Sequence, residues 1–429
     1  MLDYALLEEV IADNRKFAKK VQLFQRDVVM QEFPTCVVVG LRRCGKSYWL
    51  FQVMQNLVKS GVDWSQILYV NFESERLFGF DYRDFNRLLE ANSALTGNPQ
   101  RPILFLDEVQ IVPGWEKFAR RMADEKTRTY ITGSNAKMLS SDVASALGGC
   151  YLLTRMMTLS FPEFLRAKGI PFDRGAVATT EDRGIIRNAF QRYLFFGGFP
   201  EVVKASKEMQ LNYVDNVFQA IYLRDIIERC GVTNHKALQM MLRKLAESLG
   251  QPISFSRLTN ILKETENKLS KVSVISYIGA CEDACLLHTI PNIHGKILER
   301  ETRPKYYFAD NGLINLLRRD PEAALLENLV ALSLLRRYKA KDAVYYYAHN
   351  VEVDFYVPED ELAIQVAVTL QHSPETLKRE VGALEKFSKV YPCKRKIILT
   401  QEEEMQIDSS AGPIEVLPLW KWLLQEASR

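Results

Sequence analysis

One short segment constrains the fold more than any other part of this sequence. It reads Gly-Leu-Arg-Arg-Cys-Gly-Lys-Ser at residues 40–47, which matches the phosphate-binding loop pattern GxxxxGK(S/T). A β-branched run at 35–40 precedes it, and residues 46–59 follow with helical periodicity. A strand, a glycine-containing loop and a helix in this order predict an α/β fold built on a parallel sheet.

The loop has the residue types that phosphate binding requires. Gly40 and Gly45 allow backbone N–H groups to curl around phosphates, and the start of the next helix adds the positive end of its dipole. Lys46 is expected to reach the β- and γ-phosphates, and the Ser47 hydroxyl to be a ligand of Mg²⁺. We therefore predict that ATP and Mg²⁺ bind here. The residues expected at the nucleotide are Gly40, Arg42, Arg43, Cys44, Gly45, Lys46, Ser47 and Tyr48.

Cys44 lies inside this loop, beside Arg43 and at the start of a predicted helix. Positive charge and a helix N-terminus both stabilise a thiolate. One expectation is therefore a lowered pKa and a thiol that alkylating reagents attack unless nucleotide covers it. The alternative is that Cys44 points into the sheet and is inert.

A second motif, at residues 103–108, reads Ile-Leu-Phe-Leu-Asp-Glu. An apolar strand that ends in two carboxylates places them at the carboxyl edge of the sheet, beside the phosphate loop. Asp107 is expected to support Mg²⁺, directly or through water, and Glu108 to polarise the attacking water. The glutamate favours hydrolysis over nucleotide binding alone.

A third segment, at residues 130–135, is a strand that runs into a polar tip. In ATPases of this architecture a polar residue at this place contacts the γ-phosphate or the attacking water. Asn135, or Ser134, is therefore the candidate sensor, and Asn135 joins Lys46 and Glu108 in the expected catalytic group. The alternative is a capping turn before a helix that starts near Lys137.

Apolar strands separated by helices continue through the first part of the chain. The predicted strands after the first are at 67–72, 102–107 and 128–133, which indicates a parallel sheet covered on both faces. Residues 151–159 are a candidate for a fifth strand. After residue 161 the pattern is helical, with segments at 236–249, 254–263 and 270–287. After residue 304 strands at 306–309, 344–347, 351–357 and 362–368 alternate with helices at 321–338 and 374–390.

Length and composition indicate a globular protein of two to four domains. The chain has 429 residues, 47% of them hydrophobic and 25% charged. Its longest apolar runs are strand-sized, and its first residues lack the features of a signal peptide. We expect a cytoplasmic protein without membrane contact. A formal charge of +3 decides nothing about nucleic acid, so that question depends on local patches.

Further motifs are spread along nearly the whole chain. They include Thr-Gly-Ser at 132–134, Gly-Gly-Phe-Pro-Glu at 197–201 and Tyr-Tyr-Phe-Ala-Asp-Asn-Gly-Leu at 306–313, besides residues 159–164, 222–225, 327–328, 352–355 and 364–366. In this order they resemble a prokaryotic family of AAA+ ATPases with a C-terminal restriction-endonuclease-like domain of unassigned function. The resemblance implies an AAA+ ATPase core at 1–160, a helical lid at 161–232, a winged-helix segment at 233–303 and a PD-(D/E)xK nuclease-like α/β domain at 304–429.

One departure concerns the arginine that often acts on a neighbouring subunit's nucleotide in this family. The family pattern is Gly-Arg after the sensor helix, whereas here Gly-Gly at 148–149 is followed by Cys150. Arg155, Arg120 and Arg121 are the substitutes to consider. The identity, and even the existence, of an arginine finger stays open.

Residues 254–287 have helix–turn–helix proportions, and residues 269–273 resemble the turn into a recognition helix, with Ser270 as its N-cap. In that arrangement the residues placed for phosphate contacts are Lys263, Lys268 and Lys271, and those able to approach bases are Ser273, Ser276 and Tyr277. One expectation is DNA binding. The alternative is a winged helix used for protein packing.

The C-terminal region has part of a nuclease pattern. Glu327 on a helix, Asp354 on a strand and Gln365-Val366-Ala367 on the next strand follow the nuclease-like layout, which needs two acidic metal ligands and a water-activating lysine. Gln365 stands where the second acid belongs and Ala367 where the lysine belongs. We therefore expect a non-catalytic domain, with Lys378 of the following helix as the lysine able to reach back.

The seven cysteines are scattered without CxxC spacing. Cys281 and Cys285, with His288 and His294, allow a zinc site to be considered, but their apolar neighbours favour reduced, buried thiols. Taken together, the sequence predicts an ATP-hydrolysing switch or motor that acts on DNA or a protein client, with oligomer formation open. The alternatives are a nucleotide-binding scaffold with negligible turnover and an ATP-regulated nuclease.

Overall fold

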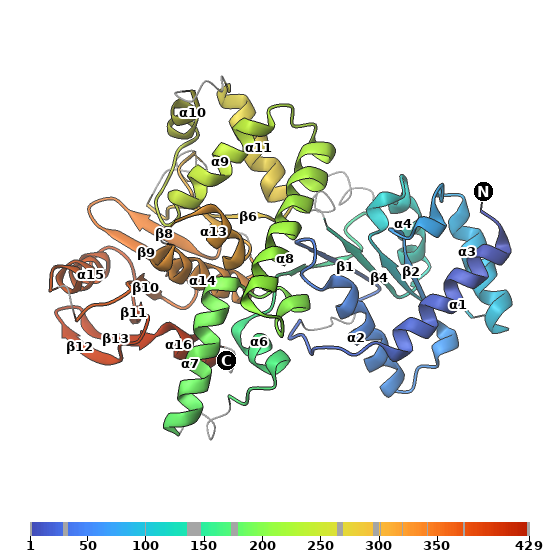
Figure 1. The fold of residues 1–429 in the computed structure, drawn as a ribbon, viewed down its shortest axis with the longest axis horizontal. Helices are drawn as coiled ribbons and strands as arrows, with labels where there is room; N and C mark the ends of the chain where they lie inside the picture. The colour runs from blue at the N-terminus through green and yellow to red at the C-terminus, as the bar shows by residue number, and fades with distance from the viewer. Residues whose placement is uncertain are drawn as a thin grey trace. The chain divides into compact units, whose positions relative to one another are not determined.

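The structure is a computed structural model. It describes residues 2–28, 33–98, 100–134, 147–172, 179–263, 269–294, 300, 302–319, 321–340, 342–371 and 374–426. The chain divides into two compact units (Figure 1). Unit 1 holds Met1–Met157 and Asp283–Cys285, and unit 2 holds Thr158–Glu282 and Leu286–Arg429.

Unit 1 is built on a five-stranded sheet in which every neighbouring pair is parallel. The strand order is β2 (Ile67–Asn71), β3 (Ile103–Asp107), β4 (Thr129–Gly133), β1 (Thr35–Gly40) and β5 (Leu152–Met156). The central strands β1 and β4 are buried along their whole length, because their apolar runs are covered on both faces. The predicted parallel α/β sheet is confirmed, with strand ends that shift by a few residues.

Helices α1 (Tyr4–Lys20), α2 (Lys46–Lys59), α3 (Asp84–Thr96) and α4 (Trp115–Asp124) accompany this sheet, with short 3-10 turns η1 (Trp64–Gln66), η2 (Glu75–Leu77) and η3 (Val109–Ile111). Helix α2 has the bounds that its periodicity predicts. Helix α1 is absent from the sequence analysis, although Leu7, Val10 and Ile11 bury one of its faces in the core.

Unit 2 begins with helices α6 (Phe161–Lys168), α7 (Thr180–Phe196) and α8 (Lys207–Ala220), the turn η5 (Pro200–Val202) and the π-helical segment η6 (Ile221–Glu228). Sequence sets these boundaries. Ser160 and Glu163 form a capping box at the start of α6, and the Thr179 side chain caps α7.

Three helices and a two-stranded antiparallel sheet follow. They are α9 (His235–Glu247), α10 (Phe255–Lys263), α11 (Lys271–Asp283), β6 (Leu287–Ile290) and β7 (Lys305–Phe308). The amide N–H of Ser273 donates to Ser270 Oγ at 3.0 Å, so Ser270 caps α11 as predicted. The helix ends at Asp283, before residue 287, because β6 begins there.

The C-terminal part of unit 2 has a mixed six-stranded sheet. Its order is β12 (Met405–Ser409), β13 (Gly412–Pro418), β11 (Arg395–Thr400), β10 (Leu362–Val366), β9 (Glu352–Val357) and β8 (Tyr345–Ala348). The helices of this part are α13 (Asn311–Leu317), α14 (Glu322–Arg337), α15 (Pro374–Phe387) and α16 (Leu419–Glu426). Strands β8 to β10 and helices α14 and α15 lie where the sequence predicts them; β11 to β13 and α16 are additional.

A buried polar network joins the end of α7 to the start of α13. Asp310 accepts hydrogen bonds from the amides of Gly198 and Gly312, each at 2.9 Å. A Cβ atom at Gly197, whose φ is +75°, would lie 1.6 Å from Asp310 Oδ1, so only glycine fits. Asn311 donates to the Leu194 carbonyl at 2.9 Å. The motifs at 197–201 and 306–313 therefore hold unit 2 together.

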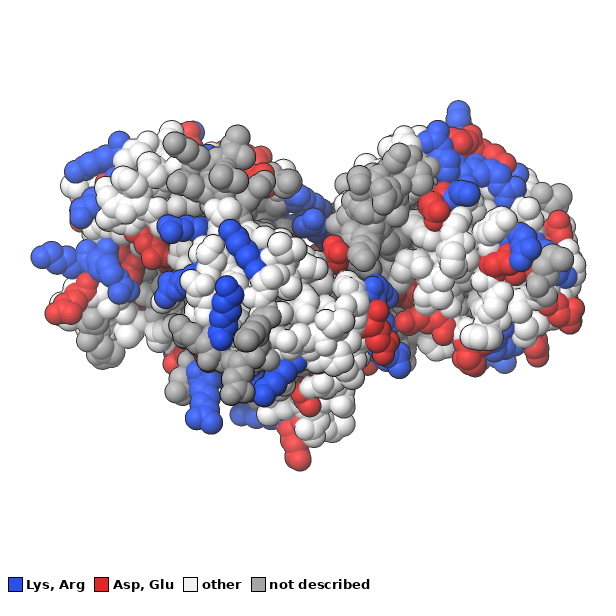
Figure 2. All heavy atoms as spheres, turned by 90° about the horizontal axis from the view of Figure 1, so that it is seen from above, with Lys and Arg blue, Asp and Glu red and all other residues white. Residues whose placement is uncertain are grey.

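Surface charge is mixed. Lys and Arg side chains share the face shown in Figure 2 with Asp and Glu side chains, in line with a formal charge of +3. No helix in the described ranges is both long enough and apolar enough to cross a bilayer.

Candidate functional site: a phosphate loop with two buried carboxylates

The loop after β1 has a backbone that its glycines permit. Arg43 and Gly45 have φ angles of +64° and +102°, and Gly45 is the N-cap of α2. A Cβ atom at Gly40 would lie 2.0 Å from the Met156 carbonyl oxygen of β5, so a larger residue there would push the strands apart. The loop thus turns the chain sharply into α2, whose first amides have no partner within the helix.

Lys46 spans the loop with its side chain. It is 4% exposed, and its Nζ donates to the carbonyl oxygens of Gly40 at 3.1 Å and Leu41 at 3.2 Å. The same atom lies 3.4 Å from Glu108 Oε1. The ammonium therefore links the end of β1 to the end of β3.

Asp107 is fully buried at the end of β3. Tyr69 Oη donates to its Oδ2 at 2.9 Å, and Thr132 Oγ1 donates to its Oδ1. The Ser47 hydroxyl is a third hydrogen-bond partner, so the two residues predicted to support Mg²⁺ are in contact. Burial and the neighbouring Glu108 raise the pKa of Asp107 despite these hydrogen bonds.

Glu108 has a left-handed backbone, with φ of +53°, and is held from several sides. Its amide donates to Thr132 Oγ1 at 3.1 Å, and its Oε2 accepts from the Ser134 amide at 3.1 Å and from Gln110 Nε2 at 2.6 Å. Burial alone would raise the pKa of this carboxyl, but Lys46 and the hydrogen bonds outweigh burial and lower the pKa. The group is held as a carboxylate.

Tyr69, Gln110 and Thr132 complete the site, although the sequence analysis gives them no role. Each contacts one of the two carboxylates. Thr132 belongs to the Thr-Gly-Ser motif at 132–134. It lies next to Asp107 because its strand, β4, pairs with β3. Ser134 contributes its backbone amide. Asn135 lies outside the described residues.

The expected activation of Cys44 is wrong. Its side chain is fully buried, and its Sγ donates to the Met156 carbonyl oxygen at 3.4 Å. Burial raises the pKa of this thiol, and the positive charges of Lys46 and Arg26 do not reverse that shift. The structure therefore supports the alternative in which Cys44 points into the sheet.

Of the remaining loop residues, Arg43 and Tyr48 are exposed and Arg42 is partly buried. Arg42 forms an ion pair with Glu73 at 3.1 Å, Arg43 is exposed, and the Tyr48 ring meets Phe51 edge-on with its centroid 5.8 Å away. All eight residues predicted at the nucleotide thus lie between the end of β1 and the first turn of α2, but the Cys44 side chain faces inward.

The candidate arginines differ in their surroundings. Arg120 donates to Asp124 at 3.0 Å and to the Leu147 carbonyl at 3.1 Å, and Arg121 donates to Asn86 at 2.6 Å. Arg155 is exposed on β5. Among the described residues, Arg155 makes fewer hydrogen bonds than Arg120 and Arg121.

The site fits ATP with Mg²⁺. Mg²⁺ takes one or two protein oxygen ligands and completes its octahedral shell with phosphates and water, and Ser47 with Asp107 offers two adjacent oxygens. A cation there would also offset the burial that raises the pKa of Asp107. Elsewhere in the described part of the chain, no group of three or more His, Cys, Asp or Glu side chains is arranged to hold a metal ion, and Cys281 is fully buried.

The predicted base contacts of α11 are partly wrong. Tyr277 is buried, and its hydroxyl accepts from the Asn234 amide at 3.3 Å, because it faces α9 instead of solvent. Lys263, Lys271 and Ser276 are exposed and Ser273 is half-buried. Lys268 lies outside the described residues.

At the C-terminal sheet, Glu327 and Asp354 come together around a lysine that the sequence analysis overlooks. Lys305 of β7 lies 3.3 Å from Glu327 and 3.2 Å from Asp354. Gln365 joins β9 to β10, since its Oε1 accepts from the Asp354 amide at 2.8 Å. The lysine at this cluster is therefore Lys305, whereas the sequence alone indicates only Lys378 as a lysine able to reach back.

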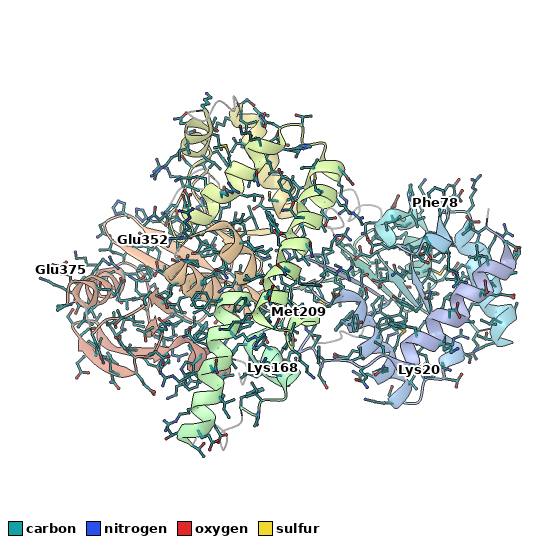
Figure 3. The ribbon with its side chains drawn as sticks, viewed as in Figure 1. Lys20, Phe78, Lys168, Met209, Glu352 and Glu375 are labelled. Atoms are coloured by element: carbon teal, nitrogen blue, oxygen red, sulfur yellow. The ribbon has the colours of Figure 1, made fainter. Side chains whose placement is uncertain are left out.

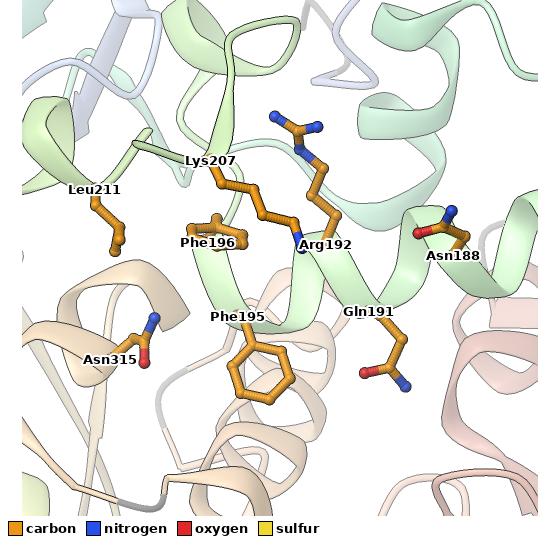
Figure 4. Close-up of a pocket in the computed structure, with 8 residues that line it drawn as sticks. All are labelled: Asn188, Gln191, Arg192, Phe195, Phe196, Lys207, Leu211 and Asn315. Carbon is orange, nitrogen blue, oxygen red and sulfur yellow. The ribbon is translucent and has the colours of Figure 1, made fainter. Parts of the chain in front are cut away.

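A pocket of about 600 Å³ lies in unit 2, at α7, α8 and α13. Figure 4 shows that the side chains lining it point in different directions, with Gln191 and Phe195 on one side and Arg192 on another. Arg192 Nε donates to Gln210 at 3.0 Å. None of the predicted site residues lines this pocket, so we do not place the chemistry there.

Comparison with known proteins agrees with the geometry. Residues 32–165 match a family described as AAA domain, and residues 187–323 match a domain of unknown function (DUF8612). The parallel sheet, the phosphate loop and this match define a P-loop ATPase of the AAA class. The chain belongs to the same family as the uncharacterized protein MJ1544 of Methanocaldococcus jannaschii, with 32% identity over 99% of this chain and 96% of that protein.

A second relative is an uncharacterized protein of Haemophilus influenzae, 31% identical over 91% of this chain and 94% of its own. Among solved structures, the Walker-type ATPase PABY2304 of Pyrococcus abyssi is similar with a TM-score of 0.41 and 14% identity, covering 71% of this chain and 100% of that one. Cdc6p of Pyrobaculum aerophilum has a TM-score of 0.26 and 13% identity, covering 76% and 93%.

Proposed function

We propose that this AAA-type ATPase hydrolyses ATP and uses its nucleotide state as a switch or motor on DNA or a protein partner. One observation carries the proposal. The ends of three adjacent strands bring Lys46, Asp107 and Glu108 within one buried site, and Glu108 is kept ionised there by Lys46, Gln110 and Ser134. A buried carboxylate that stays charged is what a general base needs.

In this proposal each residue has a separate task. The loop amides and the start of α2 bind the phosphates, and Lys46 moves from its loop carbonyls and Glu108 to the phosphate charge. Ser47 and Asp107 hold Mg²⁺, which would neutralise phosphate charge when bound. Glu108, released from Lys46, orients a water molecule and accepts its proton.

The test separates binding from turnover. Glu108→Gln keeps the shape of the side chain but not its basicity, so it should bind ATP with unchanged affinity and lose at least about 100-fold in turnover. Lys46→Ala should weaken binding of a fluorescent ATP analogue. Glu73→Gln, an exposed glutamate that pairs with Arg42, is the matched control. A wild-type rate in Glu108→Gln would remove the proposed general base.

The same variants address the scaffold alternative. A nucleotide-binding scaffold would bind ATP and release phosphate at a negligible rate in the wild type. Glu108 then has no catalytic role, and Glu108→Gln would change nothing. Phosphate release by the wild type that Glu108→Gln abolishes rules the scaffold out.

DNA is the partner that we propose for the segment at 233–303. Three helices followed by two antiparallel strands support a winged-helix arrangement, and α11 exposes Lys271 and Ser276. The same helix exposes Val272 and Ile275, at 75% and 43%, which favours a protein partner as the second candidate. Turnover measured with and without duplex DNA decides, since a DNA-coupled ATPase should respond and a protein-coupled one should not.

The finer domain plan also remains a proposal. In it, 1–160 is the ATPase core, 161–232 a lid, 233–303 the winged helix and 304–429 a nuclease-like domain without catalysis. The last assignment is supported by Gln365, which binds backbone groups of β9, and by Ala367, which has no polar side chain. Supercoiled DNA incubated with Mg²⁺ or Mn²⁺ should stay intact, and cleavage lost in Asp354→Ala would contradict the proposal.

A further inference from the structure

The strongest charge cluster outside the phosphate site surrounds Lys305 in unit 2. This lysine has no exposed surface, and its Nζ lies 2.9 Å from Glu352, 3.2 Å from Asp354 and 3.3 Å from Glu327. The partners come from β9 and α14. An ammonium has three N–H donors, and each faces a different carboxylate.

The surroundings enclose this cluster. Tyr307 Oη donates to Glu327 Oε1 at 2.8 Å, and the Tyr346 ring centroid lies 5.4 Å from Lys305 Nζ. Gly250, three residues beyond the end of α9, touches Glu327 so closely that a Cβ would lie 2.2 Å from Oε2. Of the three acids, only Glu352 is about half exposed, at 49% of its side chain; its place in unit 2 is labelled in Figure 3.

The cluster has more negative than positive charge. One ammonium faces three carboxylates, and the nearby Arg379 is engaged with Glu380 at 2.6 Å. Oxygens of three different carboxylates therefore surround the single ammonium of Lys305.

We propose that Lys305 is a built-in counter-ion that stands where a divalent cation would otherwise bind Glu327, Glu352 and Asp354, whose carboxylates are not arranged to hold a metal ion while the ammonium is present. The ammonium closes this site to metal ions and fastens β7 to β9 and α14. Nothing in this inference depends on the ATPase, because all four residues belong to unit 2.

Geometry explains why lysine and metal exclude each other. The oxygens lie 2.9–3.3 Å from Nζ, whereas Mg²⁺ and Ca²⁺ bind oxygen at about 2.0–2.6 Å. A metal ion therefore cannot enter beside the ammonium. With the ammonium gone, three carboxylates from two elements need to move inward by only roughly 0.5–1 Å to become ligands.

The experiment removes the ammonium and looks for the metal. Nucleotide-free wild type, Lys305→Ala and Lys305→Ala/Asp354→Asn are titrated with Mn²⁺, and bound Mn²⁺ is counted by electron paramagnetic resonance. Lys305→Ala should bind about one more Mn²⁺ per chain than the wild type, and the double variant should lose it. Mn²⁺ should also raise the unfolding temperature of Lys305→Ala by several degrees.

The outcomes decide in either direction. A folded Lys305→Ala that binds no additional Mn²⁺ overturns the proposal, and so does additional binding that persists in the double variant. If Lys305→Ala folds neither with nor without Mn²⁺, the wild type is compared with Asp354→Asn. If the wild type binds a Mn²⁺ ion that Asp354→Asn does not bind, the proposal is overturned. If both proteins bind the same number of Mn²⁺ ions, the result supports a site that Lys305 already occupies.

Discussion

Thr132 is the side chain on which the geometry of both carboxylates depends. Its hydroxyl donates to Asp107 Oδ1 and accepts from the Glu108 amide at 3.1 Å, so one atom fixes the Mg²⁺ residue and the proposed base. Thr132→Val keeps the shape and removes only that hydroxyl. We expect both a loss of stability in unit 1 and a fall in turnover, because Glu108 loses its backbone anchor.

The magnitude follows from the two hydrogen bonds. A bond to a charged carboxylate contributes about 1.5–3 kcal/mol, and a buried amide left without a partner costs about 1–3 kcal/mol. The added methyl group of valine returns about 1 kcal/mol through burial. Thr132→Val should therefore destabilise unit 1 by about 1.5–5 kcal/mol.

Thr35 provides a matched control in the neighbouring strand β1. It is also fully buried, but its Oγ1 has no hydrogen-bond partner among the described residues. Thr35→Val should therefore be neutral, or stabilising by up to about 1 kcal/mol. Hydrogen exchange of peptides from β3 and β4 reports the stability of unit 1 separately from unit 2. Equal losses in the two variants, or none in Thr132→Val, would refute the reasoning.

Three further predictions concern other sites. Cys44 should react with iodoacetamide more slowly than the half-exposed Cys150, because burial raises the pKa of its thiol, and peptide mass spectrometry that finds equal labelling would contradict this. The pKa of Glu327 is raised from 4.5 to about 7 in the folded protein, so its protonated form stabilises the fold at low pH and this contribution is lost as pH rises through 7. Relative to Glu327→Gln, the free energy of unfolding of the wild type, measured in urea, should fall by up to about 3 kcal/mol between pH 5 and 7. Parallel plots of unfolding free energy against pH for the two proteins would refute this. Lys271→Ala should lower the salt slope of DNA binding by about one unit, and Ser276→Ala should leave it unchanged; equal slopes in all three proteins would exclude Lys271 from the interface.

The sequence predicts which residues meet at the carboxyl edge of the unit 1 sheet because each motif is local. Residues 40–47 are contiguous, and residues 103–108 are an apolar run that ends in acids, so each motif carries its own strand. Parallel strands then align their carboxyl ends without further information. This is why the expected contacts between Lys46, Ser47, Asp107 and Glu108 follow from motif spacing.

The sequence does not predict the surroundings of residues whose neighbours come from distant parts of the chain. The reactive interpretation of Cys44 fails because desolvation depends on β5, which packs against the loop. Lys305 reaches Asp354 over a separation of 49 residues, and no pattern near β7 indicates that a lysine there is buried. The position of Tyr277 along α11 fits a contact with DNA bases, but the packing of α11 against α9 decides which side of α11 is buried, and Tyr277 lies on that side.

The bond between Gly198 and Asp310 has a consequence for synthesis on the ribosome. These residues are 112 positions apart, so at 5–20 residues per second the end of α7 waits roughly 6–22 s for its acceptor to emerge. Asn311, which binds the Leu194 carbonyl, arrives no sooner. Nascent chains that stop before residue 310 should therefore keep the α7 terminus open to proteases and chaperones, while β1 to β5 of unit 1 are already complete. Translation pauses within this interval would lengthen that exposure.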